Sequence, residues 1–285
     1  MLTDHFIEVG CVKTRYWTAG DTGSAVLLLH GIGCSVREWE RNIEVLAARH
    51  RVFALDLLGS GLTDKLVDET YSLRRLAQFV LDCMKVTAIA QARLAGNSLG
   101  GRLALECAAM APQQVKSLLL VDPAGMERRE TPFEFRLATL PILGEIFTWP
   151  NRLGTNMLWR KAFAEPSWFV TEELASTKVS LARQPGAQST FLKTLRGFLD
   201  FGGFRPELVA ELQGLLPRIK APTLVAWGRD DRFVPCAQAE VLRRTLPNVE
   251  VQIWDHCGHA PQVECSQRFN DAALGFWRRL DTIPG

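Results

Sequence analysis

Six short apolar runs, spaced along most of the chain, constrain its fold more than any other feature. The first is Ala25–His30 (AVLLLH), and further runs follow at Arg51–Leu55, Ala92–Gly96, Val115–Val121, Pro222–Trp227 and Val249–Trp254. A continuous apolar run of this length is typical of a strand that is buried on both faces of a parallel sheet. The chain therefore predicts a core built on such a sheet.

Helical patterns lie between these runs. We expect helices at Val36–Arg49, Ser72–Met84, Leu99–Met110, Cys236–Thr245 and Ser266–Leu280. Alternating strands and helices predict an α/β fold with a mostly parallel, doubly wound sheet. The opening segment, Phe6–Trp17, alternates more loosely and predicts an antiparallel hairpin at the edge of the sheet.

The middle of the chain breaks this alternation. Residues 124–205 hold nine of the fifteen phenylalanines and three of the eight tryptophans, and helices are expected at Thr171–Arg183 and Ser189–Phe201. An ordinary helical subdomain would bury these aromatic side chains in its own core, and a lid would use them as apolar walls over an active site. Because the two readings are compatible, we predict a core domain of residues 1–123 and 206–285 with a helical lid of residues 124–205.

The composition excludes several functional classes. The 285 residues carry a net charge of +2, which gives no reason to expect nucleic acid or an anionic membrane as a partner. No apolar stretch has the length of a signal peptide or a membrane span. The seven cysteines are scattered without a CxxC pair, so neither a zinc site nor a disulfide framework is predicted. We expect a cytoplasmic monomer or homodimer that uses no metal and no cofactor.

One motif carries the strongest chemical signal. Gly96-Asn97-Ser98-Leu99-Gly100 fits the pattern G-x-S-x-G between a predicted strand and a predicted helix. Glycines allow the tight turn, the serine hydroxyl is presented above the sheet edge, and the helix directs backbone N–H groups toward a developing negative charge. The alternative is a glycine-rich turn that contains a serine by chance. We predict that Ser98 is a nucleophile.

A serine nucleophile needs a base, and a histidine follows the last strand. His256 and His259 both lie in the segment Asp255–Pro261. The loop that carries His259 follows a strand at the same sheet edge as Ser98, which is where ligands bind in open α/β sheets. We predict His259 as the base and His256 as a packed or surface residue. His30, after the first strand, is expected to brace its own loop.

The acid that orients the histidine should come from another strand end. Asp230 and Asp231 follow the strand that ends at Trp227, and their spacing alone does not separate them. Asp122, after a different strand, is a third candidate, although its neighbours Pro123 and Gly125 make a structural role sufficient. The carboxylate that is not catalytic would cap a helix or brace a loop.

Backbone N–H groups of the His30–Gly33 turn and of Leu99 could bind the oxyanion that forms during acyl transfer. Loss of one such donor costs about 2.7–4 kcal/mol of transition-state stabilisation in a known enzyme. Cys34 and Cys257 flank the predicted site, and we expect both to be small buried apolar residues rather than reactive thiols.

The chain resembles the α/β-hydrolase superfamily over nearly its whole length outside the lid. The segments HGIG, ALDLLGSGLTDK, GNSLGG, GRDDRFVP and CGHAPQVE occur in the order typical of that superfamily. The resemblance implies that Asp231 is the acid, that His259 is the base, and that the N–H groups of Ile32 and Leu99 form the oxyanion hole. Ser98 distinguishes the chain from epoxide hydrolases and haloalkane dehalogenases, which have an aspartate at that position.

Within the superfamily, GNSLGG and WGRDDRFVP are similar to carbon–carbon bond hydrolases that act on meta-cleavage products of aromatic rings. The chain departs from that group at three places: Cys34 and Ser35 follow HGIG, Ala260 stands where a tryptophan is common, and Lys178 is the nearest match to a lid arginine that holds the substrate carboxylate.

The sequence thus predicts a serine hydrolase that cleaves a carboxylic ester of a small or medium apolar substrate through an acyl-enzyme. Carbon–carbon bond hydrolysis by the same triad is the alternative. A third reading, from another class, is a non-catalytic receptor for a small ligand that has kept the fold.

Overall fold

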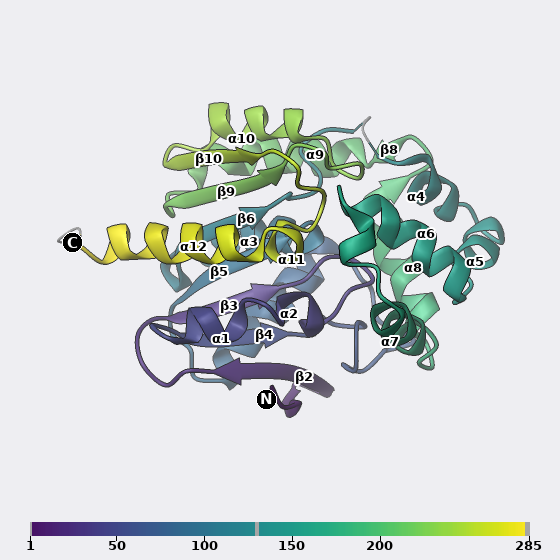
Figure 1. Cartoon of the computed structure of the whole chain (residues 1–285), viewed down its shortest axis with the longest axis horizontal. Helices are drawn as coiled ribbons and strands as arrows, with labels where there is room; N and C mark the ends of the chain where they lie inside the picture. The colour runs from purple at the N-terminus through teal and green to yellow at the C-terminus, as the bar shows by residue number, and fades with distance from the viewer. Residues whose placement is uncertain (1, 129–130, 283–285) are drawn as a thin grey trace.

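The structure is a computed structural model that describes residues 2–128 and 131–282, and its centre is an eight-stranded sheet (Figure 1). The strand order is β1-β2-β4-β3-β5-β6-β9-β10. The strands are β1 (His5–Val9), β2 (Val12–Ala19), β3 (Ala25–Leu29), β4 (Arg51–Leu55), β5 (Ala92–Asn97), β6 (Val115–Val121), β9 (Thr223–Gly228) and β10 (Val249–Trp254). Strand β2 pairs antiparallel with β1 and β4, and every other pair in this sheet is parallel. The predicted α/β-hydrolase fold and its edge hairpin are confirmed.

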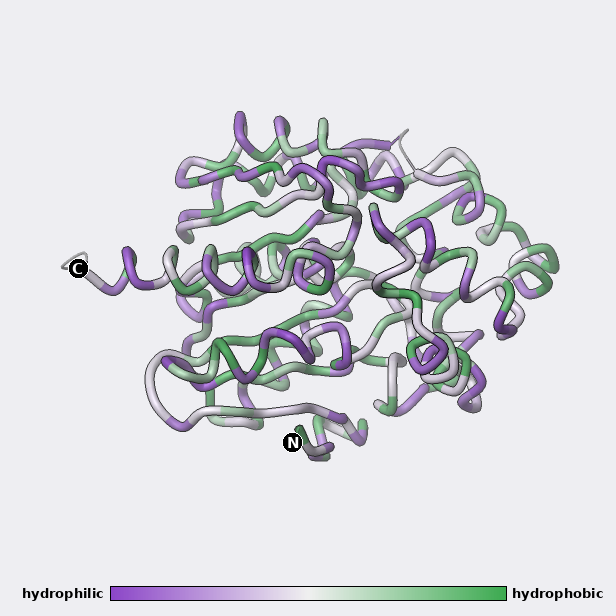
Figure 2. Tube along the Cα trace, in the orientation of Figure 1, coloured by the Kyte–Doolittle hydropathy of each residue, from purple (hydrophilic) through white to green (hydrophobic). Residues whose placement is uncertain are grey.

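Helices cover both faces of the sheet. On one face lie α1 (Ile43–Ala47) and α12 (Ser266–Asp281), and on the other lie α2 (Leu73–Val86), α3 (Leu99–Met110) and α10 (Ala239–Thr245) (Figure 1). The strands between them are mainly hydrophobic, whereas hydrophilic and hydrophobic turns alternate along α12 (Figure 2). Helices α2 and α12 thus bury one apolar face against the sheet, whereas α3 is buried on nearly all sides.

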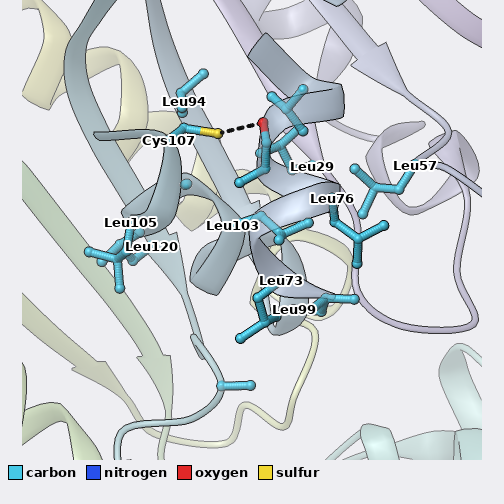
Figure 3. Close-up of a cluster of buried hydrophobic side chains, with 14 of the residues drawn as sticks. Leu29, Leu57, Leu73, Leu76, Leu94, Leu99, Leu103, Leu105, Cys107 and Leu120 are labelled. Carbon is cyan, nitrogen blue, oxygen red and sulfur yellow. Dashed lines mark hydrogen bonds between the residues drawn. The ribbon is translucent and has the colours of Figure 1, made fainter. Parts of the chain in front are cut away.

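Leucine side chains hold α3 in place, and this helix begins directly after Ser98. Figure 3 shows Leu99 and Leu103 of α3 among Leu73 and Leu76 of α2. Full burial of one such side chain contributes about 1.5–3 kcal/mol. In the same cluster the Cys107 thiol lies 3.5 Å from the carbonyl oxygen of Ala77. The position of Ser98 is therefore set by a well-packed helix rather than by a free loop.

A helical insertion joins β6 to β9. It contains α4 (Phe133–Ala138), α5 (Leu143–Phe147), α6 (Arg152–Ala162), α7 (Glu172–Ala182) and α8 (Ala187–Phe198), followed by the short hairpin β7 (Leu199–Asp200) and β8 (Gly203–Phe204) and by α9 (Pro206–Leu215). Helices α4 to α8 gather at one end of the sheet (Figure 1). The predicted lid, 124–205, includes α4 to α8 and the short hairpin but not α9, which belongs to the predicted core domain. Residues 129–130 of the predicted lid and residues 1 and 283–285 of the predicted core domain fall outside the described chain.

Three predicted helices differ from the structure. The one predicted at Ser189–Phe201 ends at Phe198, where β7 follows, and the one predicted at Cys236–Thr245 begins with a 3₁₀ helix, η5 (Cys236–Gln238), before α10. The segment 36–49 forms a 3₁₀ helix, η1 (Val36–Trp39), and the separate helix α1. The break falls at Asn42, whose side-chain amide donates hydrogen bonds to the Gln262 carbonyl at 2.9 Å and to the Asn270 side chain at 3.0 Å. These contacts to a distant segment outweigh local helix propensity. Within the described residues, no helix has both the length and the hydropathy that a membrane span requires.

Candidate active site

Ser98 occupies a strained turn between β5 and α3. Its backbone angles are φ +55° and ψ −115°, a region that costs a non-glycine residue about 1–3 kcal/mol. The Ser98 N–H donates a hydrogen bond of 2.9 Å to the Val121 carbonyl at the end of β6. The surrounding strands therefore hold this backbone in a conformation that places the serine at the carboxyl edge of the sheet.

The glycines that flank Ser98 are required by close packing. A Cβ atom at Gly100 would lie 2.1 Å from the Leu29 carbonyl oxygen, and one at Gly96 would lie 2.2 Å from the Gly100 oxygen. No real Cβ atom tolerates such distances, so these positions accept only glycine. The motif G-x-S-x-G is thus explained by the approach of α3 to the strands beneath it.

The structure brings His259 and Asp231 together. His259 Nδ1 lies 2.7 Å from Asp231 Oδ2, and the side chains are 12% and 0% exposed. The other carboxylate oxygen, Oδ1, accepts hydrogen bonds from the N–H groups of Phe233 at 2.7 Å and Val234 at 2.9 Å. These donors favour the ionised carboxylate. It can hold His259 with its proton on Nδ1, which leaves Nε2 to accept a proton.

The rival candidates lie outside this pair. Asp230 and His256 are both exposed. The Asp230 N–H donates a hydrogen bond of 2.9 Å to the Cys257 carbonyl, so this residue ties its loop to the histidine loop. Geometry therefore separates Asp231 from Asp230, although their spacing in the sequence did not.

Asn97 was not singled out from the sequence, and it joins the serine turn to the histidine loop. Its side-chain amide donates hydrogen bonds to the His259 carbonyl at 3.0 Å and to the Val121 carbonyl at 3.3 Å. Among the hydrogen bonds between described residues, none joins Ser98 Oγ to the His259 ring. Such bonds often tighten only when substrate is bound. Asn97 stands at a variable position of the motif, so the pattern gave no signal for it.

The segments that carry Ile32 and Leu99 both adjoin Ser98. A Cβ atom at Gly31 would be 3.3 Å from the Ser98 Cβ, so the loop that carries Ile32 touches the serine. Its turn is closed by a hydrogen bond of 3.2 Å from the Cys34 N–H to the Gly31 carbonyl. Leu99 is the first residue of α3, and its N–H has no acceptor within the helix.

His30 braces this loop from below, as predicted. Its Nε2 accepts a hydrogen bond of 3.0 Å from the Leu57 N–H, and its Nδ1 donates one of 2.7 Å to the Gly31 carbonyl. Burial lowers the pKa of the imidazole below its usual value. Both ring nitrogens are thus occupied and the ring is neutral, which makes His30 unsuited to act as the base.

Asp122 is the third candidate for the acid, and the structure places it close to the pair. One side-chain oxygen of Asp122, one of Asp231 and one ring nitrogen of His259 all lie within 4.8 Å of one another. Three such groups are potential metal ligands, but Asp231 already accepts three N–H donors, counting the imidazole. Both oxygens of the Asp231 carboxylate are thus engaged with donors of the protein itself.

One aromatic ring packs directly on His259, and two more lie close by. The Phe233 ring packs edge-on against His259 with a centroid separation of 5.1 Å, and Phe135 of α4 lies 5.5 Å from Phe233. Above the oxyanion loop, a Cβ atom at Gly33 would lie 3.2 Å from the ring of Phe191 in α8. The helical insertion thus supplies apolar surface directly at the site.

Lys178, the expected match to a carboxylate-binding lid residue, is already paired. Its ammonium group contacts the Glu38 carboxylate of η1, and both side chains are 5% exposed. The ammonium also lies 3.9 Å from the ring centroid of Trp159 in α6. Glu38 carried no signal in the sequence, because only the fold brings it to α7.

A model of the alpha/beta hydrolase family matches residues 26–272. The chain belongs to this family. Its match extends from β3 to α12 and includes Ser98, Asp231 and His259. The protein is therefore a hydrolase, as the sequence predicted.

Individual relatives of this hydrolase cover nearly its full length. It is 30% identical to the 2-hydroxy-6-oxononadienedioate/2-hydroxy-6-oxononatrienedioate hydrolase of Burkholderia vietnamiensis over 275 residues, which are 94% of this chain and 92% of that protein. Among solved structures, a meta-cleavage product hydrolase from Pseudomonas fluorescens superposes with a TM-score of 0.82 at 26% identity, covering 96% of this chain and 97% of that one. A putative lipase from Acinetobacter baumannii gives 0.86 at 27% identity, covering 99% and 92%.

Proposed function

We propose that this protein is a serine hydrolase that cleaves a carbon–carbon bond next to a ketone, in an acid produced by aromatic ring cleavage. The bond of 2.7 Å between His259 and Asp231, beside the strained turn at Ser98, carries the serine-hydrolase part of the proposal. The relatives named as hydrolases of 2-hydroxy-6-oxo acids support the substrate class. They favour this reaction over the ester cleavage that the sequence put first.

The proposed reaction adds one water across the bond. Ser98 Oγ attacks the ketone carbon while His259 Nε2 takes the hydroxyl proton, and Asp231 stabilises the imidazolium. The N–H groups of Ile32 and Leu99 bind the oxyanion. Collapse expels the neighbouring carbon, the departing fragment takes a proton, and water then releases the acyl group from Ser98 as a carboxylic acid.

A carbon leaving group needs its electron pair delocalised. A conjugated 2-hydroxy acid on that side of the bond meets this requirement once its enol proton has moved to the carbon that leaves, because the pair then enters a dienolate. The other side of the substrate would be apolar, since the Phe233 ring packs on His259, Phe135 packs on Phe233, and Phe191 lies close to Gly33 of the predicted oxyanion loop. An aromatic or alkyl substituent on the ketone suits such walls.

Cleavage of a neutral carboxylic ester is the second candidate, and the pair between Lys178 and Glu38 favours it. A substrate carboxylate that used Lys178 would compete with a buried Glu38 that already neutralises it. A neutral ester needs no such partner. The same Ser98 acyl-enzyme would form in either reaction.

A comparison of kcat/KM for a ring-cleavage dienone acid and for a short nitrophenyl ester tests the proposal. We expect the dienone acid to be preferred by at least about tenfold, or about 1.4 kcal/mol. The opposite preference would establish the ester reaction. A fluorophosphonate probe should label the wild type and not Ser98→Ala. If both were labelled equally and neither substrate were turned over, the remaining interpretation would be a non-catalytic receptor.

The variant Glu38→Gln separates the two substrates further. It leaves the Lys178 ammonium without its counter-charge, so kcat/KM for the dienone acid should rise while that for the ester stays unchanged. Glu40→Gln is the matched control, because Glu40 lies on the same segment and is exposed. An equal change for both substrates would mean that the ion pair only holds α7 against η1.

A further inference from the structure

The position of Asp122 ties it to both halves of the site. It follows β6, between the Ser98 turn of β5 and the Asp231 loop of β9. The backbone on either side is bonded to the serine: Val121 accepts from the Ser98 N–H at 2.9 Å, and Ala124 donates to the Ser98 carbonyl at 3.1 Å. Asp122 itself has φ +42°, a conformation that a non-glycine residue keeps only where its surroundings impose it.

The side chain of Asp122 is fully buried, and only one of its two carboxyl oxygens is hydrogen-bonded. Its Oδ1 accepts a hydrogen bond of 2.8 Å from the Gly228 N–H. Its Oδ2 is buried and has no hydrogen-bond partner among the described residues. A buried ionised carboxylate with a free oxygen is costly. A protonated carboxyl removes the cost of the buried charge, because the free oxygen then carries the proton.

The neighbours of Asp122 decide which carboxyl holds the proton. Asp231 lies within 4.8 Å and accepts three N–H donors, whereas Asp122 accepts one. Two buried carboxyl groups this close do not both ionise. Burial raises the pKa of Asp122 well above its usual range, and the charge of Asp231 raises it further. The other titratable groups that interact with it are His259, Cys236, Cys257 and Cys265.

We propose that Asp122 is a positioning residue of the relay: a neutral carboxyl group that fixes the Asp231 loop and that takes the place of Asp231 beside His259 when Asp231 is substituted by a neutral residue. The proposal rests on the proposed serine-hydrolase function. Its Oδ1 holds Gly228, three residues before Asp231, and one of its two oxygens lies within 4.8 Å of a ring nitrogen of His259. When Asp231 is made neutral, Asp122 loses its proton to solvent and supplies the negative charge.

A double-mutant cycle on kcat/KM tests this role. Asp122→Asn keeps an oxygen for the Gly228 N–H and an amide that can donate to Asp231, so activity at pH 7 should stay within about threefold of the wild type. In the Asp231→Asn background, Asp122→Asn should lower kcat/KM by a factor at least about ten times larger than it does in the wild type. Equal factors in the two backgrounds would mean that Asp122 is only structural. A loss in the single variant as large as that of Asp231→Asn would make Asp122 the principal acid.

The NMR titration of the His259 imidazole gives a readout that does not depend on turnover. In Asp231→Asn, a charged Asp122 should keep the imidazole titration at higher pH than in the double variant, by about one unit. Identical titrations would overturn the proposal. Asp230→Asn, at an exposed neighbour, is the control and should move neither measurement. Failure of the underlying function would be seen separately, as turnover that survives Ser98→Ala.

Discussion

The backbone N–H of His259 lies 2.6 Å from the carbonyl oxygen of Ala162, the last residue of α6. The loop that carries the imidazole is therefore hydrogen-bonded to the helical insertion as well as to the sheet. Gly258 makes this approach possible, since a Cβ atom there would lie 2.4 Å from the same oxygen. The insertion and the candidate base are thus positioned together.

This contact predicts the effect of Gly258→Ala. The new methyl group would push α6 away from the histidine loop, so we expect kcat/KM to fall by at least about tenfold. The sheet lies outside this contact, and circular dichroism should show a folded protein. Gly154→Ala, in the same helix with its nearest atom at 3.4 Å, should leave activity unchanged. Full activity of Gly258→Ala would mean that the contact does not position the base.

If Asp231 is the acid, substitution of Asp231 should lower kcat far more than substitution of its neighbour Asp230. Asp231→Asn removes the charge that holds the Nδ1 proton of His259, and the comparable change in a serine protease lowers kcat by about 10⁴. We expect a smaller loss here because Asp122 lies nearby, but still at least about 100-fold. Asp230→Asn should change kcat by less than about twofold. Steady-state kinetics on the preferred substrate check this, and the reverse order would move the acid to Asp230.

Because His30 is buried as a neutral imidazole, we expect the protein to become less stable to unfolding in acid. Its pKa is lowered from 6.5 in the folded protein, so below about pH 6.5 the unfolded chain binds a proton that the folded chain resists. The free energy of unfolding should therefore fall with decreasing pH, by up to about 1.4 kcal/mol per pH unit for this group. His50, whose pKa burial also lowers, should add to the fall.

Urea unfolding between pH 7.5 and 5.5 measures this dependence. His30→Gln lacks the titrating group, so its deficit relative to the wild type should shrink as the pH falls. His256→Gln, at an exposed histidine, should follow the wild type. A constant deficit for His30→Gln would show that His30 binds its proton equally in both states.

We expect the Cys34 thiol to resist alkylation, although it lies beside the predicted oxyanion loop. Burial raises the pKa of its thiol to about 12, so almost no thiolate is present at pH 8. Iodoacetamide should modify the exposed Cys11 first, and activity should persist while it does. Peptide mapping by mass spectrometry follows both sites, with Cys11→Ser as the control. Early modification of Cys34 with loss of activity would contradict this.

The sequence was sufficient where one local rule decided the outcome. The apolar runs predicted the strands β3, β5 and β9, whose residues are all buried, because a short apolar run that ends at turn residues fits a strand inside a parallel sheet. The turn at Ser98 followed from its flanking glycines, which the close approach of α3 requires. In both cases the residue type itself carries the physical constraint.

The remaining features depend on contacts between distant segments. The choice of Asp231 over Asp230 rests on which side chain turns inward. Glu38 meets Lys178 only because α7 packs on η1. The break at Asn42 likewise follows from its bonds to Gln262 and Asn270. No periodicity or spacing along the chain encodes such pairings.

The backbone at Ser98 restricts which nucleophile this scaffold can carry. With φ +55° and ψ −115°, a second heavy atom on Cβ would crowd the adjoining peptide groups, so threonine is excluded on steric grounds. Cysteine and aspartate, which are unbranched at Cβ, fit the same turn. The chemistry at this position can therefore change between hydroxyl, thiol and carboxylate by one substitution, without any remodelling of the sheet beneath it.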